Sequence, residues 1–173
     1  MTVRILRALS LILLVPVVAC EASTAPRGGR AAYVYQIPEG FRGWVKVEYS
    51  SPGCPALEDR EGGKLIEVSR AGTACTKYDR SGGWKSSAFR YGAESPRLIP
   101  EAPASADNGC CQPAVLPKGQ DPATVFVWGQ TGWTCESPKA EVQVFFVGAV
   151  DEYNKNRDDY QKFACDASPT SSP

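Results

Sequence analysis

The chain has 173 residues with nineteen basic and nineteen acidic side chains, and it contains no histidine. The balanced charge excludes the strongly basic surface by which proteins bind nucleic acids. The lack of histidine excludes the commonest general base, a common metal ligand and every Ser-His or Cys-His nucleophile pair. We leave the enzymatic question open but favour a non-enzymatic protein, and we assign no catalytic residue, cofactor or metal.

The N-terminal residues have the order of a bacterial signal peptide. Arg4 and Arg7 precede an apolar run from Leu11 to Val18, and a small residue then precedes Cys20. The run is about half of the roughly 20 apolar residues that a transmembrane helix needs. A small residue followed by cysteine resembles the lipobox of bacterial lipoproteins, in which the cysteine becomes the acylated N-terminus. We expect Cys20 to carry acyl chains such as palmitate; an ordinary signal peptide with an incidental cysteine is the alternative.

Composition divides the chain into four segments. We expect a signal peptide over residues 1–19, a lipidated cysteine and flexible tether over 20–30, one β-rich domain over 31–165 and a disordered tail over 166–173. The tether and the tail are rich in small and polar residues, and the tail lacks an apolar period. Cleavage before Cys20 would leave seventeen basic residues against nineteen acidic ones. Glu21 follows the cysteine, and the lack of aspartate there favours the outer membrane by the usual lipoprotein sorting rule.

Six cysteines remain in the expected domain once Cys20 is set aside as the anchor. An even number in an exported chain predicts a disulfide framework, whose connectivity the sequence does not fix. We favour a Cys54–Cys75 bond, and bonds from the adjacent Cys110 and Cys111 to Cys135 and Cys165. No pair has the C-x-x-C spacing of a redox or zinc site.

Strand patterns dominate the domain. Alternating or continuous apolar stretches begin at Ala31, Gly43, Lys64, Thr124 and Val142, and Gly-, Pro- and Asp-rich turns separate several of them. In residues 43–49 the alternation predicts one buried face and one solvated face that carries Trp44, Lys46 and Glu48. The sequence therefore predicts a mainly β protein, an antiparallel β-sandwich or small barrel, stapled by disulfides.

One helix is expected near the C-terminus of the domain. Residues 150–163 place Val150, Tyr153, Tyr160 and Phe163 near one face of a helix. By contrast, residues 91–123 are proline-rich and have no sustained period. Such a long irregular segment requires either covalent staples, which Cys110 and Cys111 would supply, or a role as a binding loop.

The segment IPEGFRGWVKVEY, residues 37–49, resembles a family of short bacterial lipoproteins known only as domain of unknown function 6843. Members of that family typically carry this block and a later FFVGT-x-EEY block, which the chain matches at Phe145, Phe146, Val147, Gly148, Glu152 and Tyr153. The resemblance covers roughly residues 33–154. It implies export, lipid anchoring and a β-rich fold, and it implies no activity for any residue.

Two features depart from the family pattern. Ala149 stands where the family usually has a threonine that would cap a helix, so we expect Asp151 to cap the helix instead and to start it slightly later. The six domain cysteines are also not typical of the family, which suggests extra stapling on a shared scaffold.

Two residues are candidates for ligand binding. The four tryptophans, Trp44, Trp84, Trp128 and Trp133, could stack on a sugar, but core or corner packing is the favoured interpretation, above all for Trp44 and Trp84. Trp133 is the one most expected to be exposed. Glu39 lies in a restricted turn between proline and glycine, where it could also serve only to cap the turn. No spacing identifies a second carboxylate for a glycosidase pair.

These observations predict a lipid-anchored, non-catalytic binding or structural component of the cell envelope. Its partners would be the membrane, reached through the N-terminal lipid, and an envelope protein or glycan. The alternatives are an extracytoplasmic hydrolase that uses carboxylates and a carbohydrate-binding module.

Overall fold

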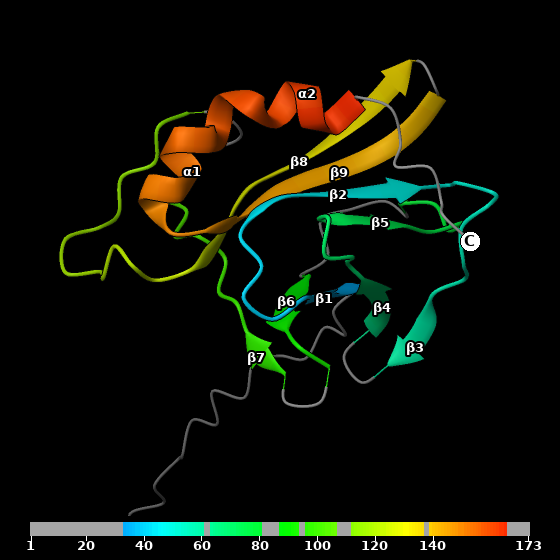
Figure 1. Cartoon of the computed structure of the whole chain (residues 1–173), viewed down its shortest axis with the longest axis horizontal. Helices are drawn as coiled ribbons and strands as arrows, with labels where there is room; N and C mark the ends of the chain where they lie inside the picture. Colours follow the sequence, from blue (N-terminus) through cyan, green and yellow to red (C-terminus); the bar gives the residue numbers. More distant parts are fainter. Residues whose placement is uncertain are drawn as a thin grey trace, which may run out of the picture.

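The computed structural model describes residues 33–60, 63–80, 87–93, 96–106, 112–136 and 139–165, and the account below concerns these residues. They form two β-sheets and one helical segment (Figure 1). We refer to the two sheets as sheet A and sheet B. In Figure 1 the helical segment lies over sheet B, and sheet A lies on the other side of sheet B.

Sheet A is a mixed five-stranded sheet in the order β3-β4-β1-β6-β7. Its central strand β1 pairs in parallel with β4 and with β6, and the short outer strands β3 and β7 are antiparallel to their neighbours. The strands are β1 (Tyr33–Ile37), β3 (Glu58–Arg60), β4 (Gly63–Glu67), β6 (Ala88–Tyr91) and β7 (Arg97–Leu98).

Sheet B has four strands in the order β5-β2-β9-β8. Strand β9 pairs antiparallel with β2 and β8, whereas β5 is parallel to β2. The strands are β2 (Gly43–Tyr49), β5 (Thr73–Cys75), β8 (Phe126–Glu136) and β9 (Lys139–Gly148). The described strands thus form a mainly β sandwich of two open sheets, which confirms the predicted fold class. Both sheets are mixed and not purely antiparallel, and the described strands do not close into a barrel.

The inter-sheet core fills the space between sheets A and B. Alternate side chains of β2 point into it, namely Val45, Val47 and Tyr49. The ring of Tyr35 stacks on Phe89 with 4.9 Å between the centroids. Phe145 of β9 in turn meets Phe89 edge-on at 5.0 Å. These aromatic contacts therefore bring β1, the first strand, and β9, the last strand, into one core.

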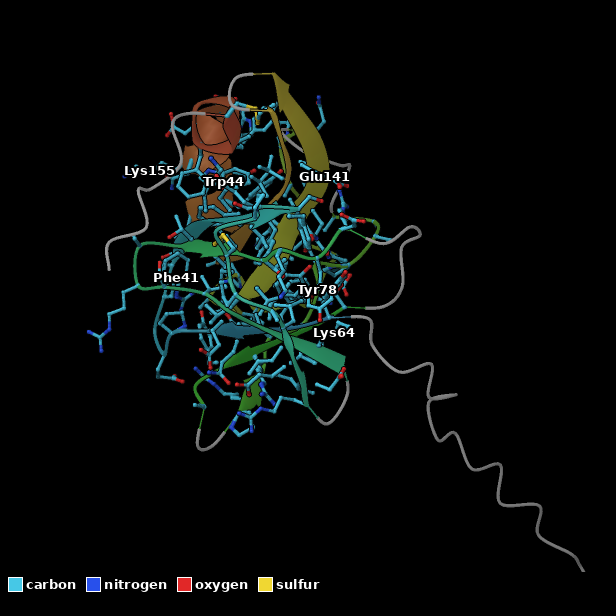
Figure 2. The ribbon with its side chains drawn as sticks, turned by 90° about the vertical axis from the view of Figure 1, so that its right-hand side faces the viewer. Phe41, Trp44, Lys64, Tyr78, Glu141 and Lys155 are labelled. Atoms are coloured by element: carbon cyan, nitrogen blue, oxygen red, sulfur yellow. A yellow bond between two sulfur atoms is a disulfide. The ribbon has the colours of Figure 1, made fainter. Side chains whose placement is uncertain are left out.

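The other face of sheet B is also buried. Trp44 is only 8% exposed and Lys46 only 4%, so the predicted solvated face of residues 43–49 is wrong. The helical segment covers this face, and in Figure 2 Trp44 lies between sheet B and that segment. The alternation within one strand could not reveal this cover, because the covering residues lie about a hundred positions later in the chain.

The helical segment consists of α1 (Val150–Asn156), a 3-10 turn η1 (Arg157–Asp159) and α2 (Tyr160–Cys165). This confirms the expected helix over 150–163, with a tighter turn in its middle. The expected cap at Asp151 is wrong, because the helix begins at Val150 and the Glu152 carboxylate accepts the N–H of Ala149 at 2.7 Å. None of these described helices is long and apolar enough to span a bilayer.

Aromatic packing fixes the helical segment on sheet B and forms the helix-side core. Trp128 stacks on Tyr153 with a centroid distance of 5.3 Å, and its indole N–H donates to the Gly148 carbonyl at 2.8 Å. The indole N–H of Trp44 donates to the Asn156 carbonyl at 3.0 Å. Both indoles are therefore buried with their polar atoms satisfied.

The described parts of the long segment 91–123 also cover the helix-side core. Ala102 donates its N–H to the Val127 carbonyl at 2.9 Å, and Ala106 and Ala114 are buried against the aromatic rings. The side chain of Asn154 holds Ala114 from both sides, accepting its N–H at 2.8 Å and donating to its carbonyl at 2.9 Å. The expected staples Cys110 and Cys111 lie outside the described residues.

Two disulfides join separate parts of the described chain. Cys54–Cys75 links the turn after β2 to β5 with a Cα–Cα distance of 5.7 Å, as predicted. Cys135 and Cys165 bond each other at 5.5 Å, so their predicted bonds to the adjacent cysteine pair are wrong. The reason is the path of the helical segment, which runs back along sheet B and ends beside β8.

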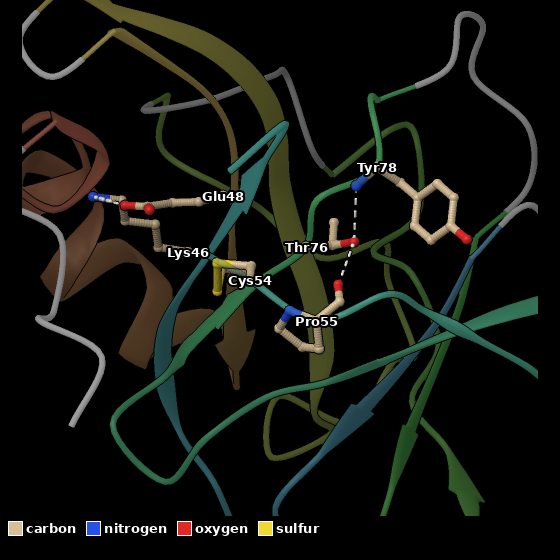
Figure 3. The surroundings of a disulfide bond; sticks show 7 residues. Lys46, Glu48, Cys54, Pro55, Thr76 and Tyr78 are labelled. Atoms are coloured by element: carbon tan, nitrogen blue, oxygen red, sulfur yellow. Dashed lines mark hydrogen bonds and ion pairs between the residues drawn. A yellow bond between two sulfur atoms is a disulfide. The ribbon is translucent and has the colours of Figure 1, made fainter. Parts of the chain in front are cut away.

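Hydrogen bonds surround the Cys54–Cys75 disulfide (Figure 3). The buried Thr76 hydroxyl donates to the Pro55 carbonyl at 3.4 Å and accepts the N–H of Tyr78 at 3.2 Å. On the helix-side face of β2, Lys46 and Glu48 form an ion pair at 3.3 Å. The disulfide and Thr76 together hold the turn after β2 against the end of β5.

Candidate functional site

A pocket of about 420 Å³ lies at the carboxyl ends of the three parallel strands β4, β1 and β6. It is lined by residues 36–38, 67–70 and 92–93. Strand β1 leaves sheet A at Pro38 and crosses to β2 in sheet B, whereas β6 turns back within sheet A to form β7. The central strand therefore turns away between its two neighbours, which leaves a hollow over its end.

A row of polar side chains crosses the three parallel strands beside the pocket. The strand register places Gln36 next to Glu67 on one side and next to Arg90 on the other. The Gln36 amide donates to the Glu67 carboxylate at 3.5 Å and accepts from Arg90 at 3.3 Å. The Nε atom of Arg90 is buried and has no hydrogen-bond partner within the described structure.

One wall of the pocket is a tight turn that follows β4. The Ser69 hydroxyl accepts the N–H groups of Ala71 and Thr73 at 3.3 and 3.2 Å and shares a 2.8 Å hydrogen bond with the Thr73 hydroxyl. Gly72 completes the turn with a φ of +79°. The turn holds Arg70 at the pocket, where its side chain is exposed and forms no ion pair with another described residue.

The opposite wall is the turn between β6 and β7. The N–H of Gly92 donates to the Ile37 carbonyl at 3.0 Å, which fixes this turn against the end of β1. Gly92 has a φ of +68°, a conformation that glycine adopts readily. The exposed Ala93 follows it at the pocket.

Glu39, the predicted candidate carboxylate, lies in the turn directly after the pocket residue Pro38. It forms an ion pair with Arg97 at 2.9 Å, and both side chains are about two-thirds exposed, at 65% and 67%. The Arg97 guanidinium also lies 5.1 Å from the centre of the Tyr91 ring. The Tyr91 hydroxyl donates to the Phe41 carbonyl at 2.8 Å, and burial raises the pKa of this phenol. The carboxylate of Glu39 is thus held by a cation and shows no second carboxylate as a partner among the described contacts.

A second polar cluster lies inside the inter-sheet core. Gln143 accepts hydrogen bonds from the hydroxyls of Tyr35 at 2.6 Å and Tyr49 at 2.8 Å, and the two hydroxyls lie 2.8 Å apart. Burial raises the pKa of Tyr35 to about 12 and also raises the pKa of Tyr49. Both phenols are nearly inaccessible, at 0% and 1% exposed, so the cluster joins the two sheets and is not open to a ligand.

The tryptophans do not assemble into a sugar-binding face in the described structure. Trp44 and Trp128 are buried in the helix-side core. Trp133 belongs to β8, but its side chain lies outside the described part, as does the whole of Trp84. The predicted lipidation site Cys20 lies outside the described residues as well.

The residues that line the pocket were not predicted from the sequence. Gln36, Glu67 and Arg70 lie on segments that are distant along the chain, and only the parallel register brings them together. The one local signal is the short run from Ser69 to Gly72, which has the composition of a tight turn. No group of three or more potential metal ligands occurs within the described residues.

Comparison with known proteins gives little on activity. No curated protein matches the chain at a significant level. A crystal structure of a candidate lipoprotein from Bacillus anthracis is similar, with 17% identity, a TM-score of 0.46 and coverage of 83% of this chain and 84% of that one. Residues 29–95, which include every residue that lines the pocket, match the model of a family of unknown function (DUF6843), and this confirms the family resemblance over that part of the chain.

Proposed function

We propose that this protein is a lipid-anchored component of the bacterial cell envelope whose β-sandwich serves as a non-catalytic binding domain. In this proposal residues 1–19 are a cleaved signal peptide, Cys20 carries the lipid and residues 21–30 tether the domain of residues 31–165. Residues 166–173 form a free tail. Glu21 in place of aspartate supports the outer membrane as the destination.

Two disulfides support export, because such bonds persist in oxidising compartments and are rare in the bacterial cytosol. The lipobox pattern that ends at Cys20 supports anchoring after export. Removal of the signal peptide would leave a domain fixed to the membrane by its N-terminus, and stable anchoring by two or more acyl chains would follow.

The observation that carries the binding role is the pocket at the carboxyl ends of β4, β1 and β6. Its walls are turns fixed by hydrogen bonds that the Ser69 hydroxyl accepts and the Gly92 N–H donates, so the pocket is formed before a ligand arrives. The alternatives of a hydrolase or a carbohydrate-binding module find no support in the described residues. Glu39 is paired with Arg97, and Trp44 and Trp128 are buried.

The anchor is tested by the intact mass of the full chain extracted from membranes, with thiols alkylated before and after reduction. We expect a lipid-sized increment on an N-terminal Cys20, and we expect Cys54, Cys75, Cys135 and Cys165 to react only after reduction. A Cys20→Ser variant should lose the increment and leave the membrane fraction. An unmodified N-terminus or free thiols at these four cysteines would contradict the proposal.

The non-catalytic role is tested by incubating the same membrane extract with envelope polymers. We expect no hydrolysis of peptide or glycan, and we expect an envelope molecule to be retained when the full chain is used as bait. Hydrolysis that disappears in Glu39→Gln or Glu67→Gln would overturn this part of the proposal.

A further inference from the structure

We propose that the pocket binds a small zwitterionic ligand with a peptide group, that is, a short peptide with a free ammonium and a free carboxylate. The inference rests on the proposed function and deepens it, since it names the ligand class for the same pocket. Three features of the pocket support it, namely its size, the opposite charges of Glu67 and Arg70, and the side-chain amide of Gln36.

The size of the pocket fits a peptide of two or three residues. Its volume of about 420 Å³ falls within the range of roughly 300 to 1,000 Å³ that small-molecule sites occupy. The pocket is bounded by the Glu67–Arg70 segment on one side and by Gly92 and Ala93 on the other. These two segments bound the pocket on opposite sides, and its mouth is open to solvent.

Opposite charges stand on one wall of the pocket. Glu67 and Arg70 both line it, and each side chain is exposed. The only described contact of the Glu67 carboxylate is the long 3.5 Å hydrogen bond from Gln36, and Arg70 forms no ion pair with another described residue. A purely anionic ligand would meet the carboxylate and a purely cationic ligand would meet the guanidinium. A ligand with one charge of each sign can pair with both.

The amide of Gln36 adds recognition of a peptide group. Its oxygen faces Arg90 and its nitrogen faces Glu67, so the orientation of the amide is fixed. A side-chain amide has two N–H donors and two acceptor lone pairs, and each hydrogen bond described here uses one of them. The remaining donor and acceptor match the carbonyl and the N–H of a peptide bond. A sugar has no aromatic ring to stack on here, because none of the residues that line the pocket is aromatic.

The test uses the full, lipid-modified chain in detergent micelles and isothermal titration calorimetry at low salt. The probe is L-alanyl-L-alanine, which is compared with its N-acetylated form, its C-terminal amide and glucose. We expect the dipeptide to bind and each capped form to bind about tenfold more weakly, because each lacks one charge-assisted hydrogen bond. Glucose should produce no binding heat.

Single substitutions test which pocket residue pairs with each charged end of the dipeptide. Glu67→Gln should weaken dipeptide binding about fivefold to tenfold and remove the discrimination against the acetylated form, and Arg70→Gln should do the same for the amide. Ala93→Phe should abolish binding by filling the pocket, with its unfolding midpoint checked to show that the domain still folds. Glu58→Gln and Arg60→Gln, on the edge strand β3, are the matched controls and should bind as the unaltered protein does.

Several results would overturn the inference. These are an absence of binding by the dipeptide, equal binding of the dipeptide and both capped forms, and unchanged affinity in Glu67→Gln and Arg70→Gln. Binding of glucose alone would assign the pocket to a glycan and would also overturn it. Each of these results leaves the lipid on Cys20 and the retention of an envelope molecule untouched, so failure of the pocket inference is distinct from failure of the proposed function.

Discussion

Gly72 lies where the turn after β4 meets the start of β2. A side chain on this glycine would collide with the carbonyl oxygen of Trp44 and would lie 2.8 Å from the Phe41 ring. Its φ of +79° is also costly for any residue with a Cβ atom. Two separate costs therefore coincide at Gly72, two residues after the pocket residue Arg70.

Gly72→Ala is expected to lower the free energy of unfolding by about 2 to 4 kcal/mol, because it adds a steric clash to the conformational cost. Gly40→Ala is the matched control, since Gly40 has a φ of +73° but no atom within 4 Å of the added methyl group. It should cost about 1 kcal/mol. Chemical denaturation measures both, and equal losses in the two variants would show that the close contact with Trp44 carries no energy.

The tyrosine pair in the inter-sheet core makes stability depend on alkaline pH. In the unfolded chain both phenols titrate near a pKa of about 10, whereas burial raises the pKa of Tyr35 to about 12 and also raises that of Tyr49. The folded state therefore keeps these protons longer than the unfolded state. This contribution to stability is fully present below pH 10 and is lost as pH rises toward and beyond 12.

We expect the free energy of unfolding to fall steeply above pH 10 and to fall less steeply in Tyr35→Phe or Tyr49→Phe. Urea denaturation in steps from pH 8 to pH 12 measures these slopes. Tyr78→Phe, which removes the hydroxyl of a tyrosine that is 38% exposed, is the control and should keep the slope of the unaltered protein. Parallel slopes in all four proteins would contradict a role for the buried pair.

At the scale of elements, the side chain of Asn154 in α1 holds the long segment before β8. Asn154 pairs with both backbone groups of Ala114, and this segment in turn covers the rings of the helix-side core. Leu116 packs there as well, two residues further on. The helix thus organises a stretch in which the described residues between β7 and β8 form no helix or named strand.

Asn154→Ala should destabilise the protein by about 1 to 3 kcal/mol, because it leaves two backbone groups without partners. It should also speed tryptic cleavage after the exposed Lys118, which follows the released segment. Asn154→Asp keeps the acceptor for the Ala114 N–H and loses the donor, so an intermediate rate is expected. Limited proteolysis that proceeds equally fast in all three proteins would contradict this role of Asn154.

The elements that the sequence predicts are those whose signal is local. The alternation of Val45, Val47 and Tyr49 marks β2, and the spacing of Val150 and Tyr153 marks α1. Strands β3, β5 and β7 have three residues or fewer, which is too short for any period to show. The parallel pairing of β1 with β4 and β6 leaves no local pattern at all, and the pocket that depends on this pairing was missed for that reason.

Of the two described disulfides, one could be predicted from the sequence and the other could not. Cys54 and Cys75 lie 21 positions apart and bracket the antiparallel pair of β3 and β4, so proximity along the chain was a sufficient guide. The bond between Cys135 and Cys165 depends on the path of the helical segment back across sheet B. That path is set by the packing of Tyr153 on Trp128, which no spacing in the sequence encodes.

At the scale of the whole molecule, sheet B belongs to both hydrophobic cores. On β2 the side chain of Val45 enters the inter-sheet core and that of Trp44 enters the helix-side core, and on β9 Phe145 and Phe146 divide in the same manner. Loss of either core would expose one face of the shared sheet. The two cores should therefore unfold together.

This expectation is tested by following urea denaturation with two probes. Tryptophan fluorescence of a Trp84→Phe/Trp133→Phe variant reports Trp44 and Trp128 in the helix-side core, and far-ultraviolet circular dichroism reports the sheets. We expect coincident midpoints. A fluorescence transition at lower urea would show instead that the helical layer detaches while the sandwich persists.

The direction of β1 has a consequence for how the domain would stand on a membrane. The chain enters this central strand at Tyr33 and reaches the pocket at Ile37, about 13 Å further along. With the lipid on Cys20, the dozen residues before Tyr33 could extend about 40 Å from the bilayer. The amino end of β1 would then face the membrane, and the pocket at its carboxyl end would face away from it. The pocket would be open to solutes that diffuse through the surrounding compartment.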